Sequence, residues 1–451
     1  MGEQPEIIPD EFYIRESHPY VPSKSEKEKL MEEEGTITYD GDFDASALST
    51  QGDLASFFST MRSDVTDAGE NPSLGSWTSH IQFSGAKKVV PSRIYSMAIH
   101  PQTEHLLVAA GDKDGLLGFW SLPHHIDEAA TSELEDGKRD ISELGSTWQF
   151  RLSKEPITRL FYSKDLNDLY ACSYDKVIRR LDMTTTRFES LFKADDRFDE
   201  DVFIHHCLPH PSDEHLFLVS LSNGEVIFID SRTHDIVSSF QAHDKKVNTL
   251  DVHPAGTLLL TASLGRSVKL FDIRSLPTSW EPHTFVKQKE PECTQCLHEY
   301  VHPLSVNSAF FSQSGEMIVT TCQDNHLRVL STVTTEEVEE HCVSIRHRNN
   351  TGKWLTKLMA EWYKPVGGAV KKEGVGAVDF FTCGSMDEPR QVNVYSVVTL
   401  PSKQPVVTAL PSLFSPHIAS VQSVVKTHPG FPFIACGNTS GRVVVLMNNR
   451  G

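Results

Sequence analysis

A pattern of three short apolar strands recurs seven times between residues 93 and 447. Each unit starts with an alternating strand, turns at Pro, Gly, Ser or Asp, continues into a strand of small apolar residues, and passes through a tight polar turn such as GDKDG into a third strand. Short strands repeated in this way are typical of a β-propeller. The units occupy residues 93–122, 157–183, 203–232, 247–274, 305–332, 356–397 and 420–447.

A single unit of this kind cannot bury both faces of its sheet, and stacking units around an axis solves that problem. The sequence therefore predicts an all-β fold, a seven-bladed β-propeller over residues 78–451. Because residues 420–447 supply only three strands, we expect residues 78–90 to provide the fourth strand of the last blade and so join the two ends of the ring. Deleting residues 78–92 should then destabilise the ring, whereas deleting residues 1–45 should not.

Residues 1–77 differ from the rest in composition and predict an acidic, mostly disordered tail with a short charged helix. Up to residue 85 the chain has 17 acidic and 5 basic residues, a balance of -12 out of a total of -19. The segment is rich in Ser, Asp and Glu and contains the run SEKEKLMEEEG. Since most of the negative charge belongs to the tail, it says little about the partners of the folded part.

One motif in the tail predicts a partner. QGDLASFF, residues 51–58, fits the pattern Q-x-x-L-x-x-F-F with which replication and repair proteins bind the sliding clamp. Leu54, Phe57 and Phe58 would project from one helical turn into an apolar pocket, and Gln51 would bond at its rim. The alternative is that the two phenylalanines pack back on the propeller.

Several protein classes are not supported by the sequence. No stretch approaches eighteen consecutive apolar residues, and the first residues lack the basic and apolar regions of a secretory signal, so we expect no membrane association. The eight cysteines are scattered apart from Cys293 and Cys296, which favours a reducing compartment, the cytosol or nucleus. The motifs G-x-S-x-G, H-E-x-x-H and G-x-x-x-x-G-K-[ST] do not occur. We therefore expect no enzymatic activity, no cofactor and no small-molecule substrate.

Histidines and cysteines offer no convincing metal site. The stretch CTQCLHEYVH, residues 293–302, is spaced too closely for a usual zinc finger and is interpreted as a linker between blades. The histidines of the His-Pro pairs all follow the first strand of a unit, so they are interpreted as turn residues of the repeat. They are His100, His210, His253 and His428.

The linker between the fifth and sixth units is unusually basic for an acidic chain. It contains RHRNNTGKWLTKLMAEW, residues 346–362. Phosphates require a local basic patch rather than a basic average, so this segment predicts contact with nucleic acid. Arg348 and Lys353 would pair with phosphates. Asn349 and Asn350 would bond to base or phosphate, and Trp354 would stack on a base. The alternatives are a solvated loop charge for Arg348 and Lys353 and a place in the core of the sixth blade for Trp354.

Four stretches together carry a resemblance to a known family. The chain resembles the WD repeat-containing protein 76 family, also called the CMR family of DNA damage-binding WD-repeat proteins, over roughly residues 85–449. It is more distantly similar to the small subunit of the UV-damaged-DNA-binding complex. The stretches are RIYSMAIHP…AAGDKDGLLGFW, IRHRNNTGKWLTKLMAEW, GSMDEPRQV and HPGFPFIACGNTSGRVVVLMN.

The resemblance implies a nuclear WD-repeat propeller that binds DNA and serves as a substrate receptor or adaptor of a cullin-RING ubiquitin ligase. In the UV-damage relative, basic residues on one face hold phosphates and a hairpin between blades five and six inserts a three-residue wedge. That wedge begins with an aromatic residue, whereas Gly352 stands here, so contact with the backbone or with already distorted DNA is expected. The corresponding residues, all expected on one side of the ring, are Arg93, Lys113, Lys245 and Lys246 for the phosphates and Gly352, Lys353 and Trp354 for the wedge.

A second motif concerns the ligase. LLTASLGRSVKLFDIR, residues 259–274, resembles the box with which propellers dock on the ligase's large adaptor subunit. Phe271 replaces the usual Trp, and Gly265 stands where the box has an acid. The alternative is that Asp-x-Arg is a structural feature within a blade. The residues that fit the ending of the box, in this unit and the preceding one, are Asp272, Arg274, Asp230 and Arg232.

Two classes of function follow from these motifs. The first is a nuclear DNA-binding adaptor in the DNA damage response, with DNA, the ligase adaptor subunit, the sliding clamp and histones as partners. The second is a propeller that binds only proteins, such as histones or chaperonin-like partners, through its loops. Salt-sensitive binding of DNA by the purified chain separates the two.

Overall fold

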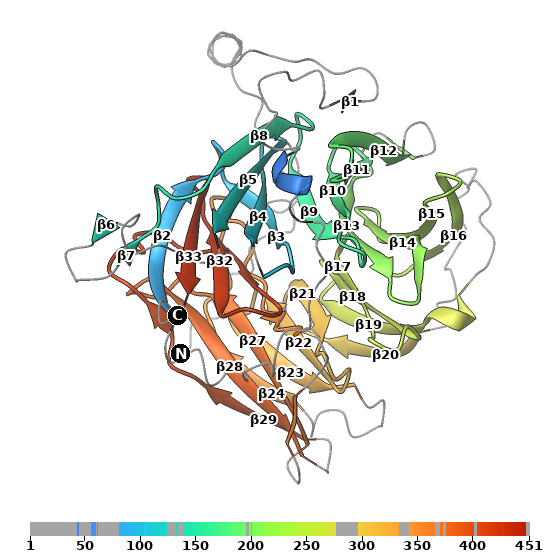
Figure 1. Cartoon of the computed structure of the whole chain (residues 1–451). Helices are drawn as coiled ribbons and strands as arrows, with labels where there is room; N and C mark the ends of the chain where they lie inside the picture. Colours follow the sequence, from blue (N-terminus) through green and yellow to red (C-terminus); the bar gives the residue numbers. More distant parts are fainter. Residues whose placement is uncertain are drawn as a thin grey trace. The chain divides into compact units, whose positions relative to one another are not determined.

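A computed structural model describes residues 43–44, 56–59, 61, 81–103, 105–123, 132–133, 139–194, 198–199, 201–276, 296–332, 342–365, 370–372, 376–400 and 404–447. In this part of the chain, seven antiparallel sheets surround an axis, and the first strands of the blades lie nearest its centre (Figure 1). The predicted seven-bladed β-propeller is confirmed. No helix within these ranges is long and apolar enough to span a bilayer.

The first four blades each contain four strands of their own, numbered here from the axis outward. Blade 1 consists of β3 (Ile94–Ile99), β4 (His105–Asp112), β5 (Leu116–Pro123) and β8 (Thr147–Arg151). Blade 2 consists of β9 (Ile157–Tyr162), β10 (Asp168–Ser173), β11 (Val177–Asp182) and β12 (Arg187–Lys193). Blade 3 consists of β13 (Ile204–His210), β14 (Asp213–Leu221), β15 (Glu225–Asp230) and β16 (Asp235–Gln241). Blade 4 consists of β17 (Val247–Val252), β18 (Leu258–Ser263), β19 (Ser267–Asp272) and β20 (Cys296–Val301), and the 3-10 helix η4 (Ile273–Ser275) follows β19.

Blade 5 follows the same plan, whereas blades 6 and 7 depart from it. Blade 5 consists of β21 (Val306–Phe311), β22 (Met317–Cys322), β23 (His326–Ser331) and β24 (Cys342–Arg346). Blade 6 consists of β25 (Glu361–Trp362), β27 (Gly376–Gly384), β28 (Gln391–Thr399) and β29 (Pro405–Ala409), with β26 (Val370–Lys372) beside β27 and β30 (Leu413–Phe414) beside β28. Blade 7 consists of β31 (Val424–Thr427), β32 (Phe433–Gly437), β33 (Arg442–Met447) and β2 (Gln82–Lys88). Outside the blade order, β1 (Phe43–Asp44) pairs with β12, and β6 (Ser132–Glu133) pairs with β7 (Arg139–Asp140).

The ring closes through a strand that precedes blade 1. β2 pairs antiparallel with β33, with Gln82 opposite Met447 at one end of the pairing. Just after β2, the N–H of Val89 donates to the carbonyl oxygen of Gly441 at 3.0 Å. The expectation that residues 78–90 supply the fourth strand of the last blade is therefore confirmed.

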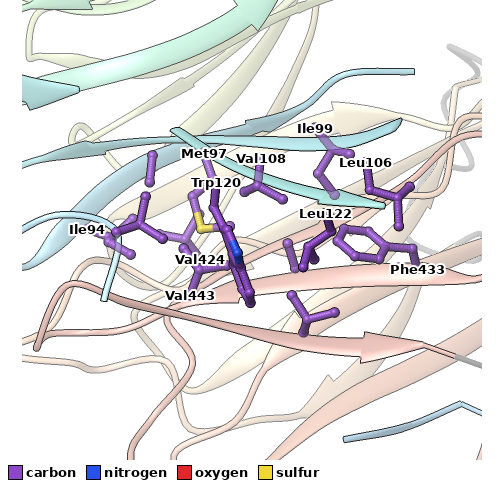
Figure 2. Packing of buried hydrophobic residues seen from close by; sticks show 14 of the residues in the cluster. Ile94, Met97, Ile99, Leu106, Val108, Trp120, Leu122, Val424, Phe433 and Val443 are labelled. Carbon is purple, nitrogen blue, oxygen red and sulfur yellow. The ribbon is translucent and has the colours of Figure 1, made fainter. Parts of the chain in front are cut away.

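Apolar side chains fill the seam between blades 7 and 1. Trp120 is fully buried there, and its indole Nε1 donates to the carbonyl oxygen of Leu144 at 3.0 Å. Fully burying a large apolar side chain contributes about 1.5–3 kcal/mol. Figure 2 shows the side chains that meet at this seam, among them Ile94, Met97, Val108 and Trp120 from blade 1 and Val424, Phe433 and Val443 from blade 7.

The second strand of each blade carries small residues because neighbouring blades cover both of its faces. In β4 every residue after the first is buried, and in β32 all five residues are buried. A Cβ atom added to Gly111 would lie 2.7 Å from the side chain of Ile157 in blade 2. The requirement for close approach of the blades thus explains the small apolar strand that recurs in the sequence.

The His-Pro histidines fasten one blade to the next. In each, the backbone N–H two residues later donates to Nδ1, so Nε2 carries the proton. The Nε2 groups of His100, His210 and His428 lie 3.2, 3.2 and 3.1 Å from the carbonyl oxygens of Leu166, Gly256 and Gln102 in the turns of the following blades. His253 bonds to the backbone of Gly315 in the same way. The interpretation of these histidines as residues of the repeat is confirmed.

Antiparallel order sorts the turns onto two sides of the ring. The turns between second and third strands lie on the same side as the linkers from one blade to the next, and we call this the linker side. The turns between first and second strands and between third and fourth strands lie on the other side, the hairpin side. The linker side comprises the described residues of 89–93, 113–115, 152–156, 174–176, 194–203, 222–224, 242–246, 264–266, 302–305, 323–325, 347–360, 385–390, 415–423 and 438–441.

The two phenylalanines of the clamp-like motif pack on the propeller. Phe58 is 1% exposed, and its ring lies 5.8 Å from the ring of Phe119 in an edge contact. The ring of Phe57 lies 5.4 Å from that of Trp148. A clamp anchor must insert these rings into a pocket of the partner, so the predicted clamp-binding role of Phe57 and Phe58 is wrong in this conformation, and the alternative holds.

The boundary predicted at residue 77 needs a related correction. Phe58 and Met61 belong to a buried cluster shared by blades 1 and 2, and Phe43 pairs with Phe188 of β12. Parts of the segment assigned to the tail therefore contribute to the propeller. Gln51 and Leu54 lie outside the described residues.

Candidate nucleic-acid interface

Cationic side chains gather on the linker side. On the hairpin side, the described turns and strand ends carry Arg139, Lys164, Arg187, Arg232, Arg274, Lys364, Lys371 and Lys372 among more numerous carboxylates. The four cations that the resemblance assigned to phosphate binding all lie on the linker side, as predicted. Its described turns, linkers and strand ends carry Lys88, Arg93, Lys113, Arg151, Lys154, Lys176, Lys193, Lys245, Lys246, Arg266, Arg346, Arg348, Lys353, Lys357, Arg390 and Arg442.

Arg93 joins blade 1 to the basic linker. Its Nη1 donates to the backbone oxygen of Lys353 at 2.6 Å, and its Nη2 donates to the hydroxyl of Tyr95 at 2.9 Å. The guanidinium carbon lies 5.0 Å from the centroid of the Tyr95 ring. These contacts hold the guanidinium in one place, so the positive charge of Arg93 and the backbone of Lys353 form one rigid unit.

Two further contacts show that the basic linker crosses the end of the axis. Thr356 Oγ1 donates to the carbonyl oxygen of Ile94, the first residue of β3 in blade 1, at 2.5 Å. The carbonyl oxygen of Leu358 accepts from Asn307 Nδ2 in β21 of blade 5 at 3.4 Å. Two residues of extended chain span about 7 Å. Since blades 6 and 7 separate blades 5 and 1 along the ring, so short a segment connects them only by passing across the axis.

The tip of this linker is exposed. Trp354 is 76% exposed, and the Nζ of Lys353 lies 5.1 Å from the centroid of its ring. Gly352 has φ of +60°, and a Cβ atom added there would meet nothing within 4 Å. The predicted exposure of Trp354 is confirmed. Trp362, by contrast, is buried, and its Nε1 donates to the carbonyl oxygen of Phe310 at 2.8 Å.

Asn349 is not available to DNA, and its predicted role is wrong. The side chain is completely buried. Its Nδ2 donates to the carbonyl oxygens of Cys322 and His326 at 3.1 and 3.0 Å, and its Oδ1 lies 2.6 Å from Nδ1 of His347. Asn349 therefore satisfies backbone groups of blade 5 and fixes the start of the linker.

Exposed carboxylates accompany some of the predicted cations. Arg348 Nη1 lies 3.8 Å from an oxygen of Asp387, and Lys113 Nζ lies 3.1 Å from an oxygen of Asp114. Asn350 is exposed. Solvent-exposed ion pairs contribute little to stability, typically about 0–1 kcal/mol. Phosphates can therefore replace these carboxylates as partners of Arg348 and Lys113 at a small cost in free energy.

A second cationic group lies between blades 3 and 4. The N–H of Leu264 donates to the carbonyl oxygen of Lys246 at 2.9 Å, which ties the turn of blade 4 to the linker from blade 3. A Cβ atom added to Gly265, in the same turn, would lie 3.8 Å from the Cβ of Lys245. The exposed side chains of Lys245 and Arg266 therefore leave the surface close to each other.

A histidine of blade 3, His205, is affected by the charges of lysines from both cationic groups. Burial lowers the pKa of His205 well below its ordinary value, and the charges of Lys246 and Lys357 lower it further. Its Nδ1 lies 3.1 Å from the hydroxyl of Tyr174. Lys357 belongs to the linker that crosses the axis, whereas Lys246 belongs to the linker before blade 4. Both lysines therefore act on the charge of one residue, His205 near the start of β13.

Arg266 and Lys357 were missed in the sequence, and the repeat contains a signal only for Arg266. Arg266 occupies the tight turn of the fourth unit, at the place that GDKDG occupies in the first. Applying that correspondence to all seven units would have found it. Lys357 could not have been found in this way, because the path of the basic linker across the axis depends on contacts with blade 1.

The ligase-box residues lie on the hairpin side, away from the cations. Arg274 contacts Asp272 through Nη2 at 2.7 Å, and Arg232 contacts Asp230 at 2.5 Å. Hydrogen bonds from these arginines hold the pKa of each aspartate below its ordinary value. The arginine side chains are 71% and 63% exposed. Each pair is thus a feature within its blade, and each arginine also remains accessible to a partner.

Blades 4 and 5 share a polar contact between a buried histidine and a threonine. His243 Nε2 lies 2.7 Å from the hydroxyl of Thr261, and His302 Nε2 lies 3.0 Å from that of Thr320. Both histidines are buried between their own strand end and the second strand of the blade. Nowhere in the described ranges do three His, Cys, Asp or Glu side chains come together as a metal site requires.

A family model described as "WD domain, G-beta repeat" matches residues 234–272 and 294–331, the part of the chain that holds these two contacts. Among curated proteins, WD repeat-containing protein 76 of Xenopus laevis is 29% identical over 366 residues, 80% of this chain. DNA damage-binding protein CMR1 of Phaeosphaeria nodorum is 27% identical over 377 residues, again 80% of this chain. The chain is a relative of this WD repeat-containing protein 76 and CMR1 family.

The match to the WD repeat-containing protein 76 and CMR1 family extends over most of this chain but not over the whole of its relatives. It covers 54% of the Xenopus laevis protein, 66% of the Phaeosphaeria nodorum protein and 50% of the Mus musculus WD repeat-containing protein 76. The resemblance recognised in the sequence is thus confirmed.

Proposed function

We propose that this protein is a non-enzymatic, DNA-binding WD-repeat adaptor that acts in the nucleus in the DNA damage response. The observation that carries the proposal is the 2.6 Å contact between Arg93 and Lys353, which unites cations 260 residues apart on one side of the ring. Relatives whose name is "DNA damage-binding protein" support the choice of DNA as the anion. A polyanion binds a local patch of this kind regardless of the negative total charge.

Replacing two linker-side cations should weaken DNA binding selectively. The double variant Lys245→Glu with Lys353→Glu is expected to bind a labelled DNA duplex about tenfold or more weakly at 100 mM salt. Its plot of log affinity against log salt should also be flatter by about two, because each lost phosphate contact removes about 0.9 from that slope. Fluorescence anisotropy over a range of salt concentrations measures both quantities.

A matched control makes a charge change of the same size on the hairpin side. Lys164 and Arg187 are exposed there, and the double variant Lys164→Glu with Arg187→Glu alters the net charge equally. We expect it to bind DNA almost as the unaltered chain does. Equal weakening by both double variants would mean that total charge rather than the patch drives binding. No salt-dependent binding at all would favour the alternative function, a propeller that contacts only proteins.

The finer part of the proposal is a place in a cullin-RING ubiquitin ligase, with the hairpin side toward the large adaptor subunit. Its support is the resemblance of residues 259–274 to the docking box and the exposure of the Arg274 and Arg232 side chains. With DNA on the linker side, the adaptor would bind without competing for the same surface.

Removing these arginines should separate the two interactions. Arg274→Ala together with Arg232→Ala is expected to abolish most co-precipitation of the ligase adaptor subunit while leaving DNA affinity within about twofold, since surface substitutions away from a site have small effects. Arg187→Ala on the same side serves as the control. Unchanged co-precipitation would remove the ligase from the proposed function without affecting the DNA interface.

A further inference from the structure

The basic linker presents one aromatic side chain at the end of the propeller axis. Trp354 is 76% exposed. Leaving so large an apolar side chain in water is unfavourable, and such exposure often marks a binding site. Two residues later, Thr356 is bonded to blade 1 at 2.5 Å, and one residue earlier, the backbone of Lys353 is bonded to Arg93 at 2.6 Å. The indole therefore projects from a segment fixed on both sides and loses little conformational freedom on binding a ligand.

The surroundings of the indole favour a planar ligand that carries negative charge. The Nζ of Lys353 lies 5.1 Å from the centroid of the Trp354 ring, and Arg93 is bonded to the same stretch of backbone. Lys357 lies three residues after Trp354 along the same linker, and both Lys357 and Lys246 lower the pKa of His205, whose pKa is lowered first by burial. A stacking surface enclosed by cations is the combination with which proteins hold the bases and phosphates of nucleic-acid strands.

The geometry of the tip disfavours an intact duplex as the preferred ligand. In a duplex, both faces of every base are covered by neighbouring bases, so stacking on Trp354 requires unstacking at a cost of a few kcal/mol. Proteins that meet this cost insert apolar wedges between base steps. Here the residues beside Trp354 at the tip are Gly352 and Lys353. Gly352 has open space around it and contributes no apolar surface. A strand with unpaired bases presents the same phosphates without the unstacking cost.

We infer that the linker side recognises unpaired nucleotides, as in single-stranded or gapped DNA, by stacking a base on Trp354 while the surrounding cations hold the adjacent phosphates. This inference rests on the proposed DNA binding and specifies its substrate. It distinguishes the chain from a protein that inserts a wedge into paired DNA. It also assigns separate tasks to the patch, since the cations provide affinity for any strand and Trp354 provides the preference for an unpaired base.

The experiment compares three labelled ligands of one sequence, a single strand of 15 nucleotides, its duplex, and a duplex interrupted by a gap of three nucleotides. With the full chain at constant salt, the single strand and the gapped duplex should bind about tenfold more tightly than the intact duplex. Trp354→Ala should lose about tenfold on the first two ligands, which corresponds to about 1.4 kcal/mol, and change duplex binding little. Trp354→Phe should retain most of the preference.

A matched control removes another exposed aromatic ring. Phe414 is 49% exposed on β30, away from the axis at the outer part of blade 6, and Phe414→Ala should leave all three affinities unchanged. Equal affinities for strand and duplex, or equal losses on every ligand in Trp354→Ala, would overturn the inference while leaving the DNA-binding proposal intact. Absence of binding to all three ligands would overturn the proposed function itself. Binding of an RNA strand as tight as that of the DNA strand would support the inference and extend it to RNA.

Discussion

A chain that lacks residues 78–92 should lose the folded propeller at temperatures where the full chain is stable. The deletion removes β2, so β33 loses its outer partner and blade 7 is left with three strands. It also removes the buried side chains Ile81, Phe83, Val89 and Val90. At about 1.5–3 kcal/mol each, these account for about 6–12 kcal/mol, as much as the whole stability of a typical domain. Thermal unfolding followed by circular dichroism measures the effect.

Two controls make this prediction specific. Deletion of residues 1–41 leaves every described strand in place and should shift the melting temperature by no more than about 2 °C. A synthetic peptide of residues 78–92 added to the truncated chain should raise its melting temperature with increasing concentration, because a ligand that binds only the folded form stabilises it. If the truncated chain melted at the same temperature as the full chain, β2 would not be the strand that closes the ring.

Acid should destabilise the ring before most carboxylates are protonated. Burial lowers the pKa of His100 and His302 to about 4 and that of His243 to about 3. The unfolded chain binds these protons near pH 6.5, whereas the folded chain binds them only near pH 4 or below. The stabilisation that the neutral histidines give to the folded state is therefore fully present above pH 6.5 and is lost as the pH falls toward 4. For His100 this amounts to about 3 kcal/mol. Asp112 and Asp168, whose pKa values burial raises to about 6, act in the opposite direction over the same range.

A single variant isolates the histidine contribution from that of the carboxylates. In His100→Asn, the amide oxygen can still accept from the N–H of Gln102, but the contact with Leu166 in blade 2 and the titrating ring are gone. At pH 7 we expect a loss of about 1–2 kcal/mol in the free energy of unfolding. Between pH 7 and pH 4.5 the variant should lose less stability than the unaltered chain in urea titrations. Identical pH dependence would show that His100 is not held neutral by the fold.

The repeat explains why so much of the fold could be predicted from the sequence. Each blade uses the same local rules, so strand alternation, small residues in the second strand and His-Pro turns recur at fixed intervals. Even the closing strand followed from counting strands, because blade 7 had three and the stretch before blade 1 was unassigned. The side of the ring on which Arg93, Lys113, Lys245 and Lys353 lie follows from antiparallel order alone.

The errors concern side chains whose environment is set by distant parts of the chain. The sequence suggested that Asn349 contacts DNA. In the structure it is buried against blade 5, and its side-chain amide donates hydrogen bonds to the carbonyl oxygens of Cys322 and His326. Phe58 matched a clamp anchor, but a cluster shared by blades 1 and 2 covers it. A linear motif records residue types and spacing, whereas burial depends on which surfaces meet after folding.

Residue order by itself determined the number of blades, the strand that closes the ring and the sorting of turns onto two sides, because these follow from local periodicity and strand direction. Only the tertiary structure decided that the basic linker runs across the axis, that Arg93 holds Lys353 and that Trp354 stays uncovered. Those features depend on a contact between residues 260 positions apart. Bringing residues so far apart together costs loop-closure entropy, and the packing of the blades supplies the free energy for it. The contact between Arg93 and Lys353 therefore needs no local sequence pattern.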